Sequence, residues 1–449
     1  MIKQLTWPNP IGKQDGEFKL DRTYKALEIL GEPQKQIKNI IHIGGTNGKG
    51  STLAFLEKIL LKASFTTFSY TSPSLLCLNE RFKHNSINIS DKLFSDSIDE
   101  VSERIKTVDS TLHSELTFFE GLTVLYFYIA SSLQCDFHLL EVGLGGRYDA
   151  TNVVQNPILS IITQVSLDHV EYLGNTHRLI ALEKAEIMKN NSTTIIAKQE
   201  DNAVKDVFLQ KSQALTNNNI LLYDKDFKLE QINNDCFNLN VQGQLFTFAN
   251  PSLQGLHQYF NVSNAILAAM QIAKILNIKS LTNAKLINDA ITNTHWIARM
   301  QTVYHKDNIK VIVDGGHNQG AIKYIADKIT QLHQSGVKVY ILYSALRRKD
   351  IGQTTKEIAN LVKTKIVEDV YITKIQSCED SYDADEIAAL IEDIKPIVKS
   401  NIKDCFADFV NKNQHHTKQS VLFIYGSLYL AANAIEFFAS LGHCILIKP

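Results

Sequence analysis

A glycine-rich stretch near the start of the chain combines a lysine with hydroxyl side chains. Residues 44–52 read Gly-Gly-Thr-Asn-Gly-Lys-Gly-Ser-Thr. A glycine loop that opens into a helix presents backbone N–H groups to an anion, a lysine there binds phosphate, and a serine hydroxyl can hold a phosphate-bound metal. Gly48, Lys49, Gly50 and Ser51 therefore predict a phosphate-binding site.

This stretch departs from the general P-loop pattern. Ile43 occupies the place of the first glycine, and Gly50 separates Lys49 from Ser51. A tight turn before an ordinary helix would explain the glycines, but it would not explain a lysine and a hydroxyl at the helix start. We therefore favour phosphate binding.

Polar side chains also stand at the ends of three predicted strands. They are Ser72 after a strand over 66–71, Glu141 near the end of a strand over 137–142, and Asp168 with His169 after a strand over 159–163. Open α/β sheets bind ligands at the carboxyl ends of their strands. Glu141 could hold a metal that bridges nucleotide phosphates, although pairing with Arg147 explains it equally well. A lone histidine is usually structural.

Hydrophobic periodicity predicts the elements that position these residues. Up to residue 294 it predicts a helix before Gly31, a strand over 40–43, a helix through Ala63, a buried helix over 117–133, helices over 179–189, 262–276 and 281–292, and a small, partly antiparallel sheet within 190–250. From Lys310 it predicts strands over 310–313, 337–343, 370–373 and 421–425 and helices over 319–332 and 428–441. From composition alone, the charged side chains of residues 183–186 are expected to form a solvent-exposed helix face.

The pattern predicts an α/β fold with two domains. Residues 1–294 are expected to form a P-loop-containing, mostly parallel sheet domain with a small peripheral sheet. Residues 295–449 are expected to form a second, Rossmann-like α/β domain.

Composition and charge exclude several classes of function. The 449 residues carry a net charge of -1, so the chain lacks the basic excess that binding to nucleic acid requires. The most apolar window, 117–133, is short for a membrane span and contains Glu120, so no membrane partner is expected. The N-terminus lacks a signal-peptide pattern and the six cysteines lack paired spacing, which favours the cytoplasm.

An ordered set of motifs resembles the Mur ligase superfamily, and within it the folylpolyglutamate synthases and bifunctional dihydrofolate synthase/folylpolyglutamate synthases. The matching stretches are residues 45–51, 71–73, 79–81, 117–120, 141–152, 167–169, 171–174, 183–185, 257–261, 296–299, 314–318 and 426–430. They cover nearly the whole chain in the order of the family.

The resemblance implies an ATP-dependent amide ligase. ATP would phosphorylate the substrate carboxylate, and the amino group of L-glutamate would displace phosphate from the acyl phosphate, releasing ADP and phosphate. The acceptors would be dihydropteroate, which gives dihydrofolate, and tetrahydrofolates, which give folylpolyglutamates. The implied cofactors are one or two Mg²⁺ ions and a monovalent cation, the partners are small-molecule substrates, and the expected state is a monomer.

The resemblance also implies roles for particular residues. Those for ATP are Gly48, Lys49, Gly50, Ser51, Asn261, Arg299 and Asp314, with His317 near the transferred phosphate. Those for magnesium are Ser51, Ser72, Glu141 and His169. Those for the pterin substrate are Leu20, Asp21, Arg22, Thr117, Phe118, Phe119, Glu120, Tyr148, Asp149 and Ala150. Lys184 would be carbamylated by carbon dioxide, so that a cation becomes an anion that helps to place the second metal.

The chain departs from the usual motifs at Ser74, Ile297–Ala298, Gly316 and Glu186, and after His317–Asn318. None of these changes removes an implied ligand. The alternatives are folylpolyglutamate synthase activity alone, a muropeptide ligase, and a nucleotide-dependent switch protein without ligase activity.

Overall fold

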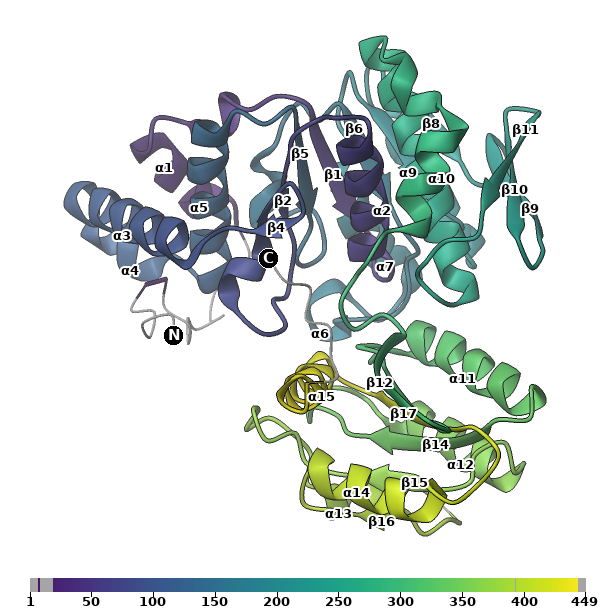
Figure 1. Ribbon diagram of the computed structural model, residues 1–449. Coiled ribbons are helices and arrows are strands. Elements are labelled where there is room, and N and C mark those ends of the chain that lie inside the picture. The colour runs from purple at the N-terminus through teal and green to yellow at the C-terminus, as the bar shows by residue number, and fades with distance from the viewer. Residues whose placement is uncertain (1–6, 9–18, 392, 443–449) are drawn as a thin grey trace. The chain divides into compact units, whose positions relative to one another are not determined.

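The computed structural model describes residues 7–8, 19–391 and 393–442. The chain forms two compact units, residues 1–252 with 258–294 and residues 253–257 with 295–449. Each unit is built on its own β-sheet with helices packed against it (Figure 1).

The first unit contains an eight-stranded sheet in the order β4-β3-β2-β5-β1-β6-β7-β8. The strands are β1 Ile40–Gly44, β2 Thr67–Tyr70, β3 Phe82–His84, β4 Ile87–Asn88, β5 Phe137–Glu141, β6 Leu159–Ile162, β7 Thr193–Ile196 and β8 Asn219–Leu222. The six neighbouring strands β2, β5, β1, β6, β7 and β8 are parallel. At one edge, β3 pairs antiparallel with β2 and with β4. The central strands β1 and β5 are buried along their whole length, which explains their continuous apolar runs.

The helices of this unit are α1 Asp21–Ile29, α2 Lys49–Lys62, α3 Asp91–Val108, α4 Ser110–Glu115, α5 Phe118–Leu133, α6 Val170–Leu173, α7 His177–Lys184, α8 Asn202–Gln213, α9 Leu256–Leu276 and α10 Ala284–Thr292. The short 3-10 helices are η1 Pro33–Lys35, η2 Leu78–Arg81, η3 Ala150–Val153, η4 Ala185–Ile187 and η5 Lys279–Thr282. The helix predicted over 117–133 is α5, and it lies in an apolar core with α1 and α3. The helix α2 packs against α10 and also contacts the strands β1, β2 and β5.

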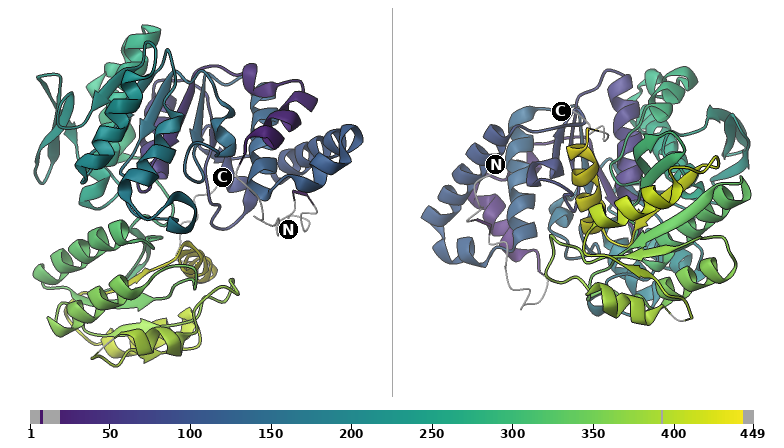
Figure 2. Two further views of the ribbon diagram at one scale, coloured as in Figure 1. Left: turned by 180° about the vertical axis from the view of Figure 1, so that it is seen from behind. Right: turned by 60° about the horizontal axis from the view of Figure 1, so that its bottom comes forward.

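Two local predictions for this unit are wrong. The helix predicted over 179–189 ends at Lys184 and continues only as the 3-10 helix η4. Residues 190–250 do not form one peripheral sheet, because β7 and β8 extend the main parallel sheet. The peripheral antiparallel sheet is confined to β9 Phe227–Ile232, β10 Cys236–Val241 and β11 Gln244–Ala249. Figure 2 shows this small sheet from behind, at the left edge of the left view. Its strand β11 contacts α10.

The second unit contains a six-stranded sheet in the order β12-β13-β17-β14-β15-β16, parallel except for β12. The strands are β12 Gln301–Lys306, β13 Ile309–Val313, β14 Lys338–Tyr343, β15 Val370–Ile372, β16 Ile397–Val398 and β17 Ser420–Tyr425. The helices are α11 Gln319–Gln334, α12 Gly352–Lys363, α13 Ala384–Leu390, α14 Ile402–Asn413 and α15 Leu428–Ser440. The α/β prediction with a second Rossmann-like sheet is confirmed.

None of the helices in the described part of the chain combines the length and apolar character needed to cross a lipid bilayer. The cysteines that the structure describes, Cys77, Cys135, Cys236, Cys378 and Cys405, are free thiols.

Candidate active site

The glycine loop between β1 and α2 has a backbone path that excludes side chains at two positions. Gly45 has φ +131°, and a Cβ there would lie 1.9 Å from the hydroxyl oxygen of Thr163. Gly48 has φ +92°, and a Cβ there would lie 2.2 Å from Oδ1 of Asn261. The left-handed backbone and the close approach both require glycine. Asn261, in α9, therefore lies against the loop that precedes the first turn of α2.

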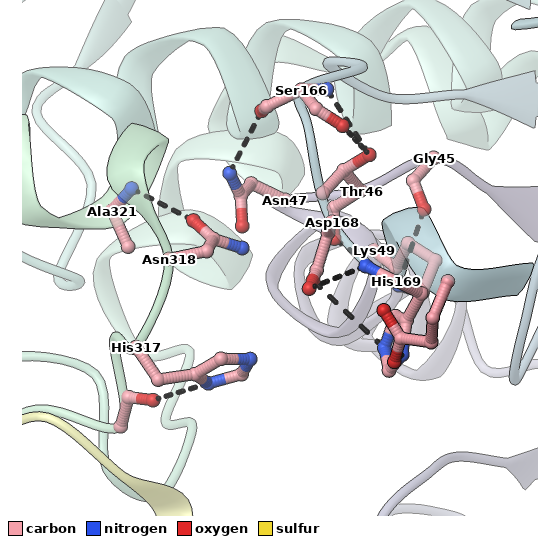
Figure 3. A network of polar contacts seen from close by, with 12 residues as sticks. Gly45, Thr46, Asn47, Lys49, Ser166, Asp168, His169, His317, Asn318 and Ala321 are labelled. Atoms are coloured by element: carbon pink, nitrogen blue, oxygen red, sulfur yellow. Dashed lines mark hydrogen bonds and ion pairs between the residues drawn. The ribbon is translucent and has the colours of Figure 1, made fainter. Parts of the chain in front are cut away.

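The segment after β6 holds the other side of this loop. The backbone N–H groups of Thr46 and Asn47 donate to the carbonyl of Gln164 at 2.8 and 3.2 Å. Asn47 Nδ2 donates to the hydroxyl of Ser166 at 3.1 Å, and the hydroxyl of Thr46 accepts from Ser166 N at 3.1 Å (Figure 3). Sequence reasoning missed these contacts, because nothing in the local pattern of residues 164–166 indicates a partner 120 residues earlier.

Two lysines converge on the carbonyl of Gly45. Lys49 Nζ donates to Gly45 O at 3.3 Å and to Thr46 O at 3.2 Å. Lys184 Nζ, from the last turn of α7, donates to Gly45 O at 2.9 Å. The two ammonium groups therefore both lie at the glycine loop, which is the predicted phosphate loop. An anion bound there would relieve their mutual repulsion.

Burial, and after it the positive charge of Lys49, lower the pKa of Lys184 to about 7, while Asp168 and Asp149 act in the opposite direction. The side chain is buried, so the solvated-face interpretation of the charge cluster is wrong for Lys184. That interpretation was based on composition, which gives no information about the contact between the end of α7 and the glycine loop.

The neighbouring carboxylates of the cluster have a different partner. Arg147 Nε donates to Glu183 at 3.0 Å, and its Nη1 lies 3.3 Å from Glu186. Glu186 also accepts from Lys211 at 2.8 Å. Glu186 replaces the usual glycine of the motif. Its ion pairs with Lys211 and Arg147 connect η4 to α8 and to the loop that contains Arg147.

Glu141 lies at the edge of the sheet where the sequence predicts a metal site. Its Oε2 accepts from the backbone N–H of Ser72 at 3.2 Å, and its Oε1 lies 4.0 Å from Lys49 Nζ. The alternative pairing with Arg147 is wrong, because Arg147 binds Glu183 and Glu186 instead. Both Glu141 and Ser51 are buried.

His169 and Lys184 line one pocket together with Lys49. The other lining residues are Gly45, Thr46, Val142, Gly143, Leu144, Gly145, Asp168 and Leu173. His169 has φ +50° at the start of the short helix α6, and its backbone N–H donates to Asp168 at 3.0 Å. Asp168 entered the sequence argument only as a neighbour of His169, although the structure places it in the pocket wall.

The donor set of this edge suits Mg²⁺. In the described residues no three His, Cys, Asp or Glu side chains form a metal-binding group on their own. The hydroxyls of Ser51 and Ser72 and the carboxylate of Glu141 are hard oxygen donors, and phosphate oxygens complete such a shell in nucleotide sites.

The fold brings together two of the predicted pterin segments. Arg22 donates to both carboxylate oxygens of Glu120, at 3.0 to 3.3 Å, although the two residues are 98 positions apart. Glu120 also closes a capping box with Thr117 at the start of α5. Leu20 and Asp21 lie at the N-terminus of α1, next to Arg22.

The aromatic residues of the second segment face other parts of the site. Phe118 lies under the guanidinium of Arg81, 5.6 Å from ring centroid to Cζ. Phe119 packs so closely on Gly143 that a Cβ there would lie 2.5 Å from its ring. The segment 117–120 is therefore in contact with the loop that follows β5.

The third predicted pterin segment, residues 148–150, differs in exposure along its length. Tyr148 is 49% exposed, whereas Asp149 and Ala150 are buried. Asp149 accepts from the backbone N–H groups of Leu144 at 2.8 Å and Thr151 at 3.0 Å. Burial raises the pKa of Asp149, and these hydrogen bonds oppose that rise. The carboxylate thus organises the loop over 143–151.

In the second unit, Asp314 organises the backbone at the end of β13. It accepts from Met300 N at 2.9 Å and from Gly316 N at 2.7 Å, and burial raises its pKa. Arg299 Nη1 donates to Ala298 O at 3.0 Å. His317, which Figure 3 labels, donates from Nδ1 to Gly315 O at 3.2 Å. Ala298 adopts a left-handed conformation with φ +54°. It is one of the positions at which this chain departs from the usual motif.

The chain matches two families of known domains. Residues 43–273 match the Mur ligase middle domain, and residues 298–428 match the Mur ligase glutamate ligase domain. The chain is 28% identical over 423 residues to the dihydrofolate synthase/folylpolyglutamate synthase of Bacillus subtilis, which covers 92% of this chain and 93% of that relative. It is 30% identical over 325 residues to the dihydrofolate synthetase of Saccharomyces cerevisiae, which covers 69% of this chain and 72% of that relative.

A solved structure has the same fold. Folylpolyglutamate synthase of Mycobacterium tuberculosis, complexed with ADP and AMPPCP, superimposes with a TM-score of 0.81 at 23% identity, over 94% of this chain and 95% of that one. The match to the middle domain alone spans most of the first unit, including the phosphate loop and Lys184. The chain therefore belongs to the Mur ligase family, and within it to the group that contains the dihydrofolate synthases and folylpolyglutamate synthases.

Proposed function

We propose that this protein is an ATP-dependent ligase that joins L-glutamate to dihydropteroate and to tetrahydrofolates, and releases ADP and phosphate. The observation that carries the proposal is the pair of lysines at the phosphate loop, Lys49 and a buried Lys184, beside the carboxylate of Glu141. The relatives described above are named for these reactions, and this supports the choice of substrates.

The phosphate loop binds the nucleotide. Gly48, Lys49, Gly50 and Ser51 surround the phosphates, whose negative charge replaces the carbonyl of Gly45 as the partner of Lys49. Asn261 contacts the nucleotide from α9, since it already lies against Gly48. The structures of the mycobacterial relative with ADP and AMPPCP support ATP as the co-substrate.

Ser51, Ser72, Glu141 and His169 would hold one or two Mg²⁺ ions, and a monovalent cation would bind to further oxygen atoms. When bound, Mg²⁺ neutralises charge on the phosphates and on the transferred phosphoryl group. Glu141 is held in place by the N–H of Ser72.

Lys184 is the site of carbamylation. A neutral amine attacks CO₂ to form R–NH–COO⁻ and releases one proton, so the reaction requires the deprotonated lysine. Because the pKa of Lys184 is about 7, about half of the side chains are neutral at that pH. The product is an anion in the pocket that Lys49 and His169 also line.

The pterin substrate binds to the segments 20–22, 117–120 and 148–150, with its carboxylate directed to the terminal phosphate. Because a carboxylate is a poor acyl donor, its phosphorylation supplies the leaving group that the amino group of glutamate then displaces. The enzyme's main contribution is to position two anions and to neutralise their charge. Arg299, Asp314 and His317 of the second unit act on the nucleotide and the transferred phosphate.

The test is the formation of ADP in three reactions: with glutamate and dihydropteroate, with glutamate and tetrahydrofolate, and with nucleotide alone. We expect turnover in the first two. Turnover only with tetrahydrofolate would reduce the function to folylpolyglutamate synthase activity. Stimulation by neither pterin would refute the proposal, and in that case a muropeptide acceptor or a switch function would be tested next. We also expect a monomer, which sedimentation of the full chain checks.

A further inference from the structure

A buried histidine of the central strand is hydrogen-bonded to the loop over 143–151. His42 lies in the middle of β1, paired with Leu140 of β5 and Ser160 of β6. Its ring is fully buried, and its Nε2 lies 2.8 Å from the hydroxyl oxygen of Thr151. The hydroxyl of Thr151 in turn lies 2.5 Å from Oδ1 of Asp149.

The chemistry of the three groups assigns the direction of each bond. An ionised carboxylate only accepts, so the hydroxyl proton of Thr151 points to Asp149. The oxygen of Thr151 must then accept from His42, which carries its proton on Nε2. Among the described residues Nδ1 of His42 has no hydrogen-bond partner, which agrees with the unprotonated nitrogen of this tautomer. Burial and the charge of Lys189 lower the pKa of His42 to about 3, so the ring is neutral.

The chain of bonds ends on the loop that borders the pocket. The second oxygen of Asp149, Oδ2, accepts from the backbone N–H of Leu144 at 2.8 Å. Leu144 and its two glycine neighbours line the pocket with Lys184. On one side Gly143 packs against Phe119, and on the other Gly146 lies so close to Glu183 that a Cβ would be 2.5 Å from its carbonyl oxygen.

We infer that His42 is a positioning residue for the pterin side of the site, because its bond to Thr151 holds the Asp149 carboxylate and, through it, the loop over 143–151. The inference rests on the proposed function, in which residues 148–150 of this loop bind the pterin. The ring of His42 is fully buried within the sheet, so it is not exposed to contact a substrate or a nucleotide directly.

The kinetic test uses three variants. His42→Leu removes the donor and keeps an apolar ring-sized volume, His42→Gln keeps an N–H donor, and Thr151→Val removes the hydroxyl between the two ends. Loss of one buried hydrogen bond predicts a roughly tenfold rise in KM for dihydropteroate or tetrahydrofolate in His42→Leu and Thr151→Val. KM for ATP should stay close to the wild-type value, and His42→Gln should recover most of the loss.

The double variant shows whether His42 and Thr151 act through the same chain of hydrogen bonds or independently. If His42 acts through Thr151, His42→Leu combined with Thr151→Val should raise KM no further than either change alone. A folded His42→Leu protein with wild-type KM for the pterin would overturn the inference. Equal rises in the KM values of all three substrates, with a lower melting temperature, would also overturn it, because that pattern indicates a structural histidine only.

A second measurement does not depend on turnover. In ¹⁵N-histidine-labelled wild-type protein, the resonance of His42, assigned by its absence in His42→Gln, should show a proton on Nε2 and none on Nδ1. The opposite tautomer would contradict the chain of bonds. If the wild-type protein forms no ADP with either pterin, the proposed function fails, whereas normal wild-type turnover with an unaltered His42→Leu variant defeats only the positioning role.

Discussion

The lowered pKa of Lys184 predicts how the stability of the first unit depends on pH. A lysine whose pKa falls from about 10.4 in the unfolded chain to about 7 in the folded chain is charged in both states at low pH. There the folded state carries the whole penalty of the buried charge. As pH rises above 7 the folded protein releases this proton before the unfolded chain does, so the contribution of Lys184 to stability becomes more favourable up to about pH 10.

The perturbation is Lys184→Met, which keeps a long apolar side chain and removes the titrating amine. Between pH 6 and pH 9, Lys184 of the unfolded chain stays protonated, whereas Lys184 of the folded protein is deprotonated above about pH 7. Each of the roughly two pH units between 7 and 9 adds about 1.4 kcal/mol to the free energy of unfolding. The free energy of unfolding of the wild type, relative to that of the variant, should therefore rise by about 2.5 kcal/mol across this range.

The assay must report the first unit alone, because the chain has two compact units. Trp7 is buried in the core of the first unit, so urea unfolding can be followed by its fluorescence in a Trp296→Phe background. The buffers contain no nucleotide and no CO₂, since carbamylation would remove the amine. Lys92→Met is the matched control, because the side chain of Lys92 is 83% exposed.

The same slope with pH in the wild type and in Lys184→Met would refute the reasoning. It would mean that Lys184 stays protonated in the folded protein, and carbamylation at neutral pH would lose its physical basis. A difference that appears equally with Lys92→Met would show a general effect of removing a positive charge.

Three further predictions follow from particular contacts. Lys184→Ala should abolish most ligase activity, and bicarbonate or acetate should restore part of it in an ADP-release assay; wild-type activity without rescue would exclude an essential carbamate. Glu120→Ala should lower the free energy of unfolding of the first unit by about 2 kcal/mol, because the capping box and the Arg22 pair are both lost, whereas Glu120→Gln should cost about 1 kcal/mol. Lys365→Gly should stabilise the second unit by about 0.5–1 kcal/mol, because Lys365 is exposed after α12 with φ +59°. Gly336→Ala should destabilise this unit, because Gly336 follows α11 with φ +83°. Thermal unfolding followed by Trp296 fluorescence checks the sign of both changes.

The phosphate loop and most of the elements around it could be predicted from the sequence. The strand–glycine–helix pattern of residues 40–63 is local, and the side chains that make it recognisable lie within a few residues of one another. The second α/β unit could also be predicted, because its strands alternate with helices of the expected length. The fold of residues 190–222 could not be predicted, because asparagine-rich connections separate the two short strands that belong to the main sheet.

The contacts of Lys184, Asp149 and Glu120 could not be read from local patterns. Lys184 reaches a carbonyl 139 positions earlier in the chain, and Glu120 binds a guanidinium 98 positions away. The motif resemblance singled out all three residues, but it did not say that Asp149 and Glu120 also hold their own loops together.

The sequence by itself determined the fold class, the phosphate loop and the family, because each depends on residue types at short or ordered spacing. Only the tertiary structure decided which charges are buried. Whether Lys184 is an ordinary solvated cation or an amine with a pKa of about 7 depends on the chain segments that exclude water around it, and those segments come from β1, β5 and the loop after β6.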